Sequence, residues 1–148
     1  MKKIVLSLLL FTTFQFTLAQ QITLDKIYSG YYRGKGISGI NSMNNGEHYT
    51  VIERDGIAKF SYQTGQKSGI IAEGNYESYE FSEDENKILL LKESQPIYRH
   101  SFLGKFEIKD LKSQKTISLN NGNPVQEPRF SPDAEKVAFI SDNNLYYQ

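Results

Sequence analysis

One stretch of the chain returns, with much of its pattern kept, 49 residues further on. Residues 81–91, FSEDENKILLL, align without a gap with residues 130–140, FSPDAEKVAFI. Residues 61–67 match residues 110–116 at the same offset, and a weaker copy of the first stretch begins at residue 42, at an offset of 39. Two independent stretches that share one offset indicate a repeat protein, in which each unit buries its faces against its neighbours.

Each repeat has the pattern of an antiparallel sheet. The Phe-Ser-x-Asp element predicts a strand end followed by a tight turn, in which the Ser and Asp side chains bond to nearby backbone N–H groups. The apolar runs at residues 88–91 and 137–140 predict strands that are buried on both faces. Further strands are expected at residues 57–62, 67–72, 105–111 and 115–119.

The length of the repeat favours one architecture. A period of 39–49 residues with about four strands per unit matches the blade of a β-propeller. We therefore expect an all-β fold of antiparallel four-stranded blades, with a β-sandwich as the alternative. The repeats lie at about residues 37–74, 75–123 and 124–148, which gives about two complete blades and part of a third. Since propellers close with roughly four to eight blades, we expect a truncated piece of a longer protein whose open sheet edges promote aggregation.

The N-terminus has the composition of a targeting sequence. Lys2 and Lys3 precede an apolar run at residues 4–11, and small residues up to Ala19 offer a cleavage site, so residues 1–19 are predicted to be a secretory signal peptide. An uncleaved N-terminal anchor is the alternative. We expect an exported protein, periplasmic or extracellular, that is not an integral membrane protein after cleavage. Residues 20–36 form an initial segment with a helical turn near residues 24–29.

Composition excludes several classes of function. The chain has 17 Lys and Arg against 17 Asp and Glu, and this balance argues against binding to nucleic acid. The absence of cysteine excludes disulfides, thiol catalysis and zinc-thiolate sites. The two histidines, His48 and His100, argue against a histidine-rich metal site. No metal and no cofactor are expected.

The repeats differ in one place that points to a binding face. The second repeat carries ten additional residues between its second and third strands, within residues 92–103. Insertions in repeat proteins map to loops on one face, which is often the binding face. The insertion contains a rigid proline, an aromatic residue and an Arg-His pair, which together form a candidate ligand contact. The alternative is a solvated loop with an ordinary surface arginine.

One tetrapeptide, YRHS, stands at residues 98–101, between the expected ILLL strand and the expected FEIKDL strand at residues 106–111. In this context it resembles a motif of the N-terminal propeller of dipeptidyl-peptidase IV. That family belongs to the prolyl oligopeptidase clan of serine peptidases. Residues 22–30, 124–133 and 142–147 fit the same family, so the resemblance covers essentially the whole chain after the signal peptide. It implies an eight-bladed propeller that caps an α/β-hydrolase domain, and the release of N-terminal dipeptides with Pro or Ala in second position.

The resemblance also implies a role for one residue. Carried over from the family, Arg99 reaches into the cavity between the two domains and hydrogen-bonds a backbone carbonyl of the substrate. A planar guanidinium, with several fixed donors, suits this task. Tyr98, His100 and Ser101 are its neighbours in the loop, and Tyr98 is expected to brace it. The implied partners are a peptide with penultimate Pro or Ala and a downstream hydrolase domain.

The sequence departs from the family in two respects. The paired glutamates that bind the substrate ammonium have no counterpart, and the Gly-x-Ser-x-Gly nucleophile elbow is absent. No catalytic Ser, Asp or His is identified, so the chain alone is expected to be inactive. Two other functions remain open: a non-enzymatic propeller module that binds proteins in the cell envelope, and a small β-sandwich that binds a ligand through residues 96–101.

Overall fold

The computed structural model describes residues 22–34 and 39–148, and the chain divides into two units, Met1–Gly36 and Ile37–Gln148. The first unit contains helix α2, Leu24–Tyr28. The helix begins after Thr23, and the Thr23 hydroxyl accepts a hydrogen bond from the backbone N–H of Lys26. The helical turn expected near residues 24–29 is therefore confirmed. The expected signal peptide lies outside the described residues. Within the described part, no helix is long and apolar enough to cross a membrane.

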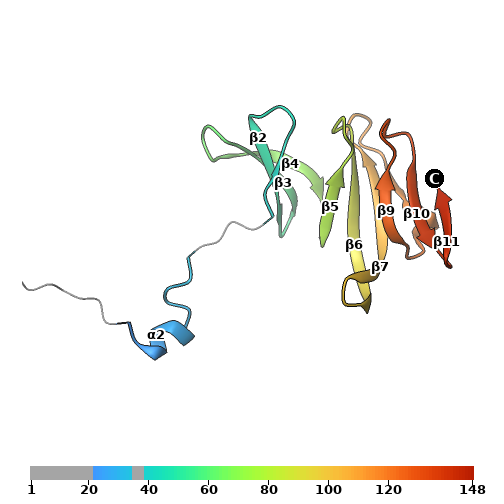
Figure 1. Ribbon diagram of the computed structural model, residues 1–148. Coiled ribbons are helices and arrows are strands. Elements are labelled where there is room, and N and C mark those ends of the chain that lie inside the picture. Colours follow the sequence, from blue (N-terminus) through green and yellow to red (C-terminus); the bar gives the residue numbers. More distant parts are fainter. Residues whose placement is uncertain (1–21, 35–38) are drawn as a thin grey trace, which may run out of the picture. The chain divides into compact units, whose positions relative to one another are not determined.

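The second unit is built from three antiparallel sheets that follow one another along the chain (Figure 1). The first sheet contains β1 to β4, at Asn41–Ser42, His48–Glu53, Gly56–Ser61 and Lys67–Glu73. The second contains β5 to β8, at Ser78–Phe81, Lys87–Tyr98, Ser101–Asp110 and Thr116–Ser118, and is followed by a 3-10 turn, η1, at Leu119–Gly122. The third contains β9 to β11, at Gln126–Phe130, Val137–Ser141 and Asn144–Tyr147. Strands adjacent in sequence are neighbours in every sheet, so the expected all-β fold, with two four-stranded units and part of a third, is confirmed.

The repeat has a physical counterpart at the strand ends. Phe81 ends β5 opposite Ile88, and Phe130 ends β9 opposite Val137, so residues 49 positions apart in sequence occupy equivalent positions. Such equivalence is what a repeat of one supersecondary unit requires.

The turn after each of these strands is also repeated. The Ser82 hydroxyl donates to the Asp84 carboxylate at 2.7 Å and accepts the backbone N–H of Lys87 at 3.0 Å. Ser131 makes the two equivalent bonds in the third sheet, at 2.5 Å and 3.0 Å. In the first sheet the Asn45 side chain takes the place of the aspartate and accepts two backbone N–H groups. The weaker copy near residue 42 is therefore a true member of the repeat.

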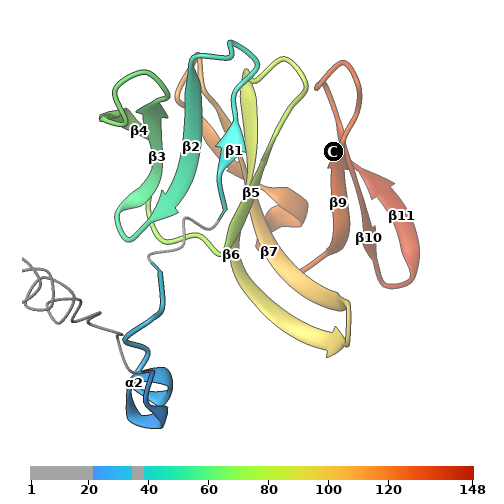
Figure 2. The same cartoon turned by 60° about the vertical axis from the view of Figure 1, so that its left-hand side comes forward.

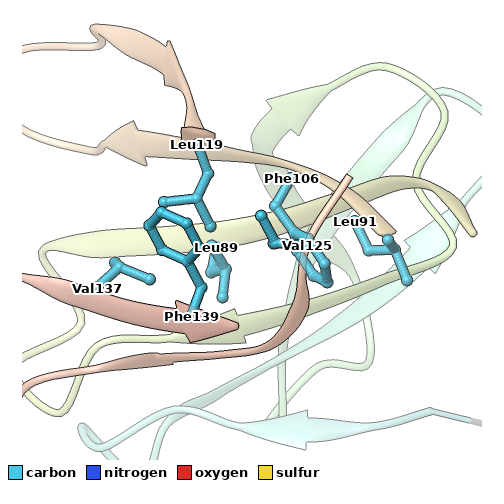
Figure 3. Close-up of a cluster of buried hydrophobic side chains, with 7 residues drawn as sticks. All are labelled: Leu89, Leu91, Phe106, Leu119, Val125, Val137 and Phe139. Carbon is cyan, nitrogen blue, oxygen red and sulfur yellow. The ribbon is translucent and has the colours of Figure 1, made fainter. Parts of the chain in front are cut away.

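One apolar run, residues 88–91, joins the second sheet to both of its neighbours. Its even-numbered side chains share a cluster with Ile57 and Ala72 of the first sheet. Its odd-numbered side chains share a cluster with Val137 and Phe139 of the third sheet (Figure 3). Since side chains alternate between the faces of a strand, four consecutive apolar residues fill two interfaces. The prediction that this run is buried on both faces is confirmed, with every member at most 4% exposed.

The corresponding strand of the third sheet differs from expectation. Val137 and Phe139 are buried in the cluster shared with the second sheet. Ala138 and Ile140, on the opposite face, are only half-buried. The prediction that residues 137–140 are buried on both faces is therefore wrong for the described residues, because the cluster that buries β10 lies on one of its faces only.

Candidate functional site

The additional residues of the second repeat lengthen two strands instead of forming a loop. β6 and β7 extend past their neighbours as a two-stranded ribbon (Figures 1 and 2). Their pairing continues from Glu93 opposite Lys105 to Tyr98 opposite Ser101. The loop predicted within residues 92–103 is therefore wrong. Two register shifts and a two-residue turn accommodate the whole insertion while the strands stay paired.

The ribbon is fixed to the sheets near its root. Gly104 and Val125 exchange two backbone hydrogen bonds of 2.9 Å. The Ser94 hydroxyl donates to Glu77 at 2.5 Å, so the other strand of the ribbon is also tied to the chain before β5. These contacts limit how far the root can bend, although most of the β6 half of the ribbon is exposed to solvent.

Close packing at the root depends on a glycine. A Cβ atom at position 104 would lie 2.7 Å from Cδ1 of Leu91 and 2.6 Å from Cε2 of Phe106. Both distances are shorter than a carbon–carbon contact allows. Gly104 therefore lets the ribbon approach the core, and Phe102 and Phe106 stack beside it with ring centroids 6.4 Å apart.

Arg99 and His100 form the turn at the tip of the ribbon. Both are exposed, Tyr98 is 83% exposed, and Ser101 is half-buried. Among residues 22–34 and 39–148, no hydrogen bond or ion pair engages the Arg99 guanidinium. Its donors are therefore available to a ligand. The bracing role expected for Tyr98 stays a prediction.

The tip brings together Tyr98, Arg99, His100 and Ser101, the four residues predicted from the sequence. The two histidines of the chain do not lie together. His48 lies in the first sheet, where its Nδ1 is 3.1 Å from the Asn45 side-chain nitrogen, whereas His100 belongs to the tip. In the part of the chain that the structure describes, no group of three or more His, Cys, Asp or Glu is arranged to hold a metal ion.

A pocket of about 230 Å³, which we call the root pocket, lies where the ribbon meets the sheets. Its walls come from β5 and β9, the first strands of two sheets, and from β6 and β7. Its apolar lining includes Leu89, Phe102, Phe106 and Pro128, whereas Glu80, Glu127 and Arg129 supply charge. The charged side chains are 44%, 59% and 65% exposed, so they form the rim of the pocket and the apolar groups its floor.

The rim is held together by ion pairs. Nη1 of Arg129 lies 2.5 Å from Oε2 of Glu80, and Nη2 lies 3.9 Å from Oε2 of Glu127. Glu127 has a positive φ of 48°, and the pairing of β9 with β10 shifts register beside it. Such a bulge re-aims a side chain relative to a regular strand.

Sequence reasoning missed the root pocket because its rim combines residues from two repeats. The sequence does contain one indication of this pocket, which is the spacing of two oppositely charged residues. Glu80 and Arg129 are 49 positions apart, so they occupy equivalent positions on β5 and β9 with opposite charge.

Comparison with known proteins agrees with this architecture. Residues 82–148 match the family described as "Dipeptidyl peptidase IV (DPP IV) N-terminal region". The probable dipeptidyl-aminopeptidase B of Aspergillus fumigatus is 33% identical over 120 residues, which cover 79% of this chain and 12% of that protein. The probable dipeptidyl-aminopeptidase B of Phaeosphaeria nodorum is 29% identical and is matched over 86% of this chain and 17% of its own length.

A solved structure extends the likeness to three dimensions. The crystal structure of Porphyromonas gingivalis dipeptidyl peptidase 4 superposes with a TM-score of 0.69 at 29% identity, over 86% of this chain and 20% of that chain. The chain thus spans a small part of the length of the proteins it matches. The resemblance inferred from the sequence is confirmed: this chain is similar to part of the N-terminal propeller region of dipeptidyl peptidase IV, and its sheets correspond to blades of that propeller.

Proposed function

We propose that this chain is the N-terminal propeller portion of an exported serine dipeptidyl peptidase that releases Xaa-Pro or Xaa-Ala dipeptides from peptide N-termini. In this proposal Arg99 holds the substrate, and a hydrolase domain outside this chain supplies the catalytic groups. The observation that carries the proposal is the exposed, unengaged Arg99 guanidinium at the tip of an anchored ribbon, among the described residues. The likeness to dipeptidyl peptidase 4 supplies the peptide as its ligand.

The geometry suits recognition of a peptide backbone. A guanidinium presents several N–H donors in one plane, and a peptide carbonyl offers two lone pairs to accept them. Because the ribbon is tied down at Gly104 and Ser94, less conformational freedom is lost when a ligand binds at the tip. Arg99 is thus proposed as a binding residue that orients the substrate.

Export is part of the proposal and rests on the composition of residues 1–19. If it is right, the mature protein begins after Ala19, and N-terminal sequencing of the protein recovered from the periplasm or medium will show this. Recovery of the protein only from the cytoplasm, with Met1 in place, would contradict export.

The role of Arg99 is tested in the full-length protein that carries this chain. We expect Arg99→Ala to lower kcat/KM for an Ala-Pro anilide by about 10- to 100-fold, the loss of a hydrogen bond from a charged donor. Arg54→Ala is the matched control, because Arg54 is an exposed arginine in the corresponding turn between β2 and β3. Equal activity of Arg99→Ala and the wild type would remove Arg99 from the site. Absence of any dipeptide release by the wild type would favour the non-enzymatic binding module.

A further inference from the structure

We propose that the root pocket binds one Lys or Arg side chain of a peptide, with the apolar stem on the pocket floor and the cationic head at Glu127. The inference rests on the proposed function for the identity of the occupant as a peptide. The pocket, its lining and its charge are independent of that function.

The size and lining of the pocket select a single long side chain. A volume of about 230 Å³ is below the range of about 300–1,000 Å³ typical of sites for drug-sized ligands. Phe102, Phe106 and Pro128 offer an apolar floor beneath a charged rim. Lys and Arg match this arrangement because they bury an apolar stem while they keep the charged head near water.

The net charge of the rim determines whether the pocket favours a cationic or an anionic side chain. Glu80 and Glu127 contribute two negative charges and Arg129 one positive charge, so the rim is negative overall. Arg129 is already engaged by Glu80 at 2.5 Å, whereas its distance to Glu127 is 3.9 Å. Glu127 is therefore the rim carboxylate whose negative charge is least compensated, and it is the expected partner of the cation.

The pocket lies within reach of a peptide held at Arg99. Phe102, which lines the pocket, is three residues from Arg99 along the ribbon and pairs with Pro96. The chain doubles back at the Arg99–His100 turn, so these three residues span at most about 10 Å. An extended peptide bound near its N-terminus by Arg99 covers the same distance with about three residues, so the cation is expected at one of the positions after the penultimate proline.

The test uses the full-length protein and pairs of pentapeptides based on Ala-Pro-Ala-Ala-Ala. One alanine after the proline, at position three, four or five, is replaced by Lys or by norleucine, which has a similar stem without the amine. Binding is measured by fluorescence polarisation with N-acetylated peptides that carry a C-terminal fluorophore. We expect the Lys peptide to bind about two- to five-fold tighter at one position, the size of one exposed charge pair.

Charge variants of the rim give the decisive pattern. Glu127→Gln should abolish the preference for Lys, because it removes the partner of the cation, whereas Arg129→Gln should increase it, because it removes the positive charge of the rim. Thermal melts show whether each variant is folded. A Lys-to-norleucine ratio near one at every position in the wild type, or the same ratio in Glu127→Gln as in the wild type, would overturn the inference.

The same peptides separate this inference from the proposed function. Free-amine versions report dipeptide release, whereas the acetylated versions report binding only. Release without a Lys preference refutes the root pocket as a cation site and leaves the peptidase proposal standing. A Lys preference that follows the rim charge, without any release, refutes the peptidase proposal and leaves the pocket standing.

Discussion

At the scale of the residue, the turn after the first strand of the second and third sheets depends on one hydroxyl next to one carboxylate. Asp84 accepts hydrogen bonds from the Ser82 hydroxyl and from the backbone and side chain of Asn86. These bonds favour the ionised carboxylate, the Ser82 bond most, and they lower the pKa of Asp84 to about 2. The pKa of Asp133 in the third sheet is lowered for the same reason, with Ser131 as the main cause.

The lowered pKa of Asp84 predicts how the turn responds to acid. Because the folded-state pKa lies below the ordinary value of 3.8, the carboxylate stabilises the fold at pH values above about 4, and this contribution is lost as the pH falls toward 2. Asp84→Ala should therefore lower Tm by a few degrees at pH 7, with a smaller difference at pH 2.5. Glu83→Ala, in the same turn, is the control for removing an exposed charge. A pH-independent difference in Tm would argue against this account.

Gly104 gives a second prediction at this scale. Adding a methyl group at this position forces Leu91 or Phe106 to move. Gly104→Ala should therefore lower the free energy of unfolding by about 1–3 kcal/mol, as overpacking does. Gly69→Ala is the matched control, since Gly69 lies in a strand and a Cβ there meets nothing within 4 Å. Urea unfolding followed by circular dichroism measures both, and equal stability of the two variants would contradict the packing argument.

At the scale of the element, β6 is the strand on which the arrangement of the second unit depends. It contacts the first sheet with one face and the third sheet with the other, and its far end carries the candidate site. A single element thus connects core packing to the position of Arg99.

Truncation of single side chains in β6 should loosen one interface at a time. Leu90→Ala and Leu89→Ala should each cost about 2–5 kcal/mol, as expected for buried leucines. Native-state hydrogen exchange should then speed up mainly in the first sheet for Leu90→Ala and mainly in the third sheet for Leu89→Ala. The same exchange pattern in both variants would show that the two interfaces open together.

At the scale of the whole molecule, the sheets bury their faces against one another but leave strand edges open. β11 pairs with β10 on one side only among the described residues, and its Leu145 and Tyr147 are 76% and 72% exposed. An open edge with exposed apolar side chains is a template for pairing with another chain.

We expect residues 20–148, produced alone, to self-associate through such edges. Leu145→Lys should reduce association, because a lysine on an edge strand opposes pairing. Ser113→Lys, in an exposed turn, controls for the added charge. Light scattering at several concentrations measures the effect. A stable monomer in the unsubstituted segment would contradict the prediction.

Most of the architecture could be predicted from the sequence because the repeats carry it. Phe81 and Phe130 share a sequence context and a structural position. The strands expected at residues 57–62 and 67–72 correspond to β3 and β4 within one residue. The ribbon was not predicted, because residues 92–95 are polar, Pro96 follows them, and all of residues 92–98 are exposed in the strand. They therefore lack the burial pattern by which a strand is recognised.

The candidate site was predictable only in part. Arg99 and its neighbours could be identified because they are consecutive in the sequence, as the tetrapeptide at residues 98–101. The root pocket was not, since Glu80 and Glu127 come together only after two sheets pack side by side. Contacts between repeats depend on how blades are oriented, and a repeat alignment does not contain that information.

Because the side chains of β6 alternate between two interfaces, insertions and deletions are restricted in one part of this strand and not in another. Removing one residue from 88–91 would exchange the sets of side chains that face the two neighbouring sheets, so this stretch tolerates no single insertion or deletion. The ribbon beyond residue 91 does not pack between two sheets, so a change in its length does not exchange the side chains at the two interfaces. Adding one residue to each of its strands would carry the arginine about 3.3 Å further out without disturbing the blades, so the reach of the tip and the integrity of the stack can evolve separately.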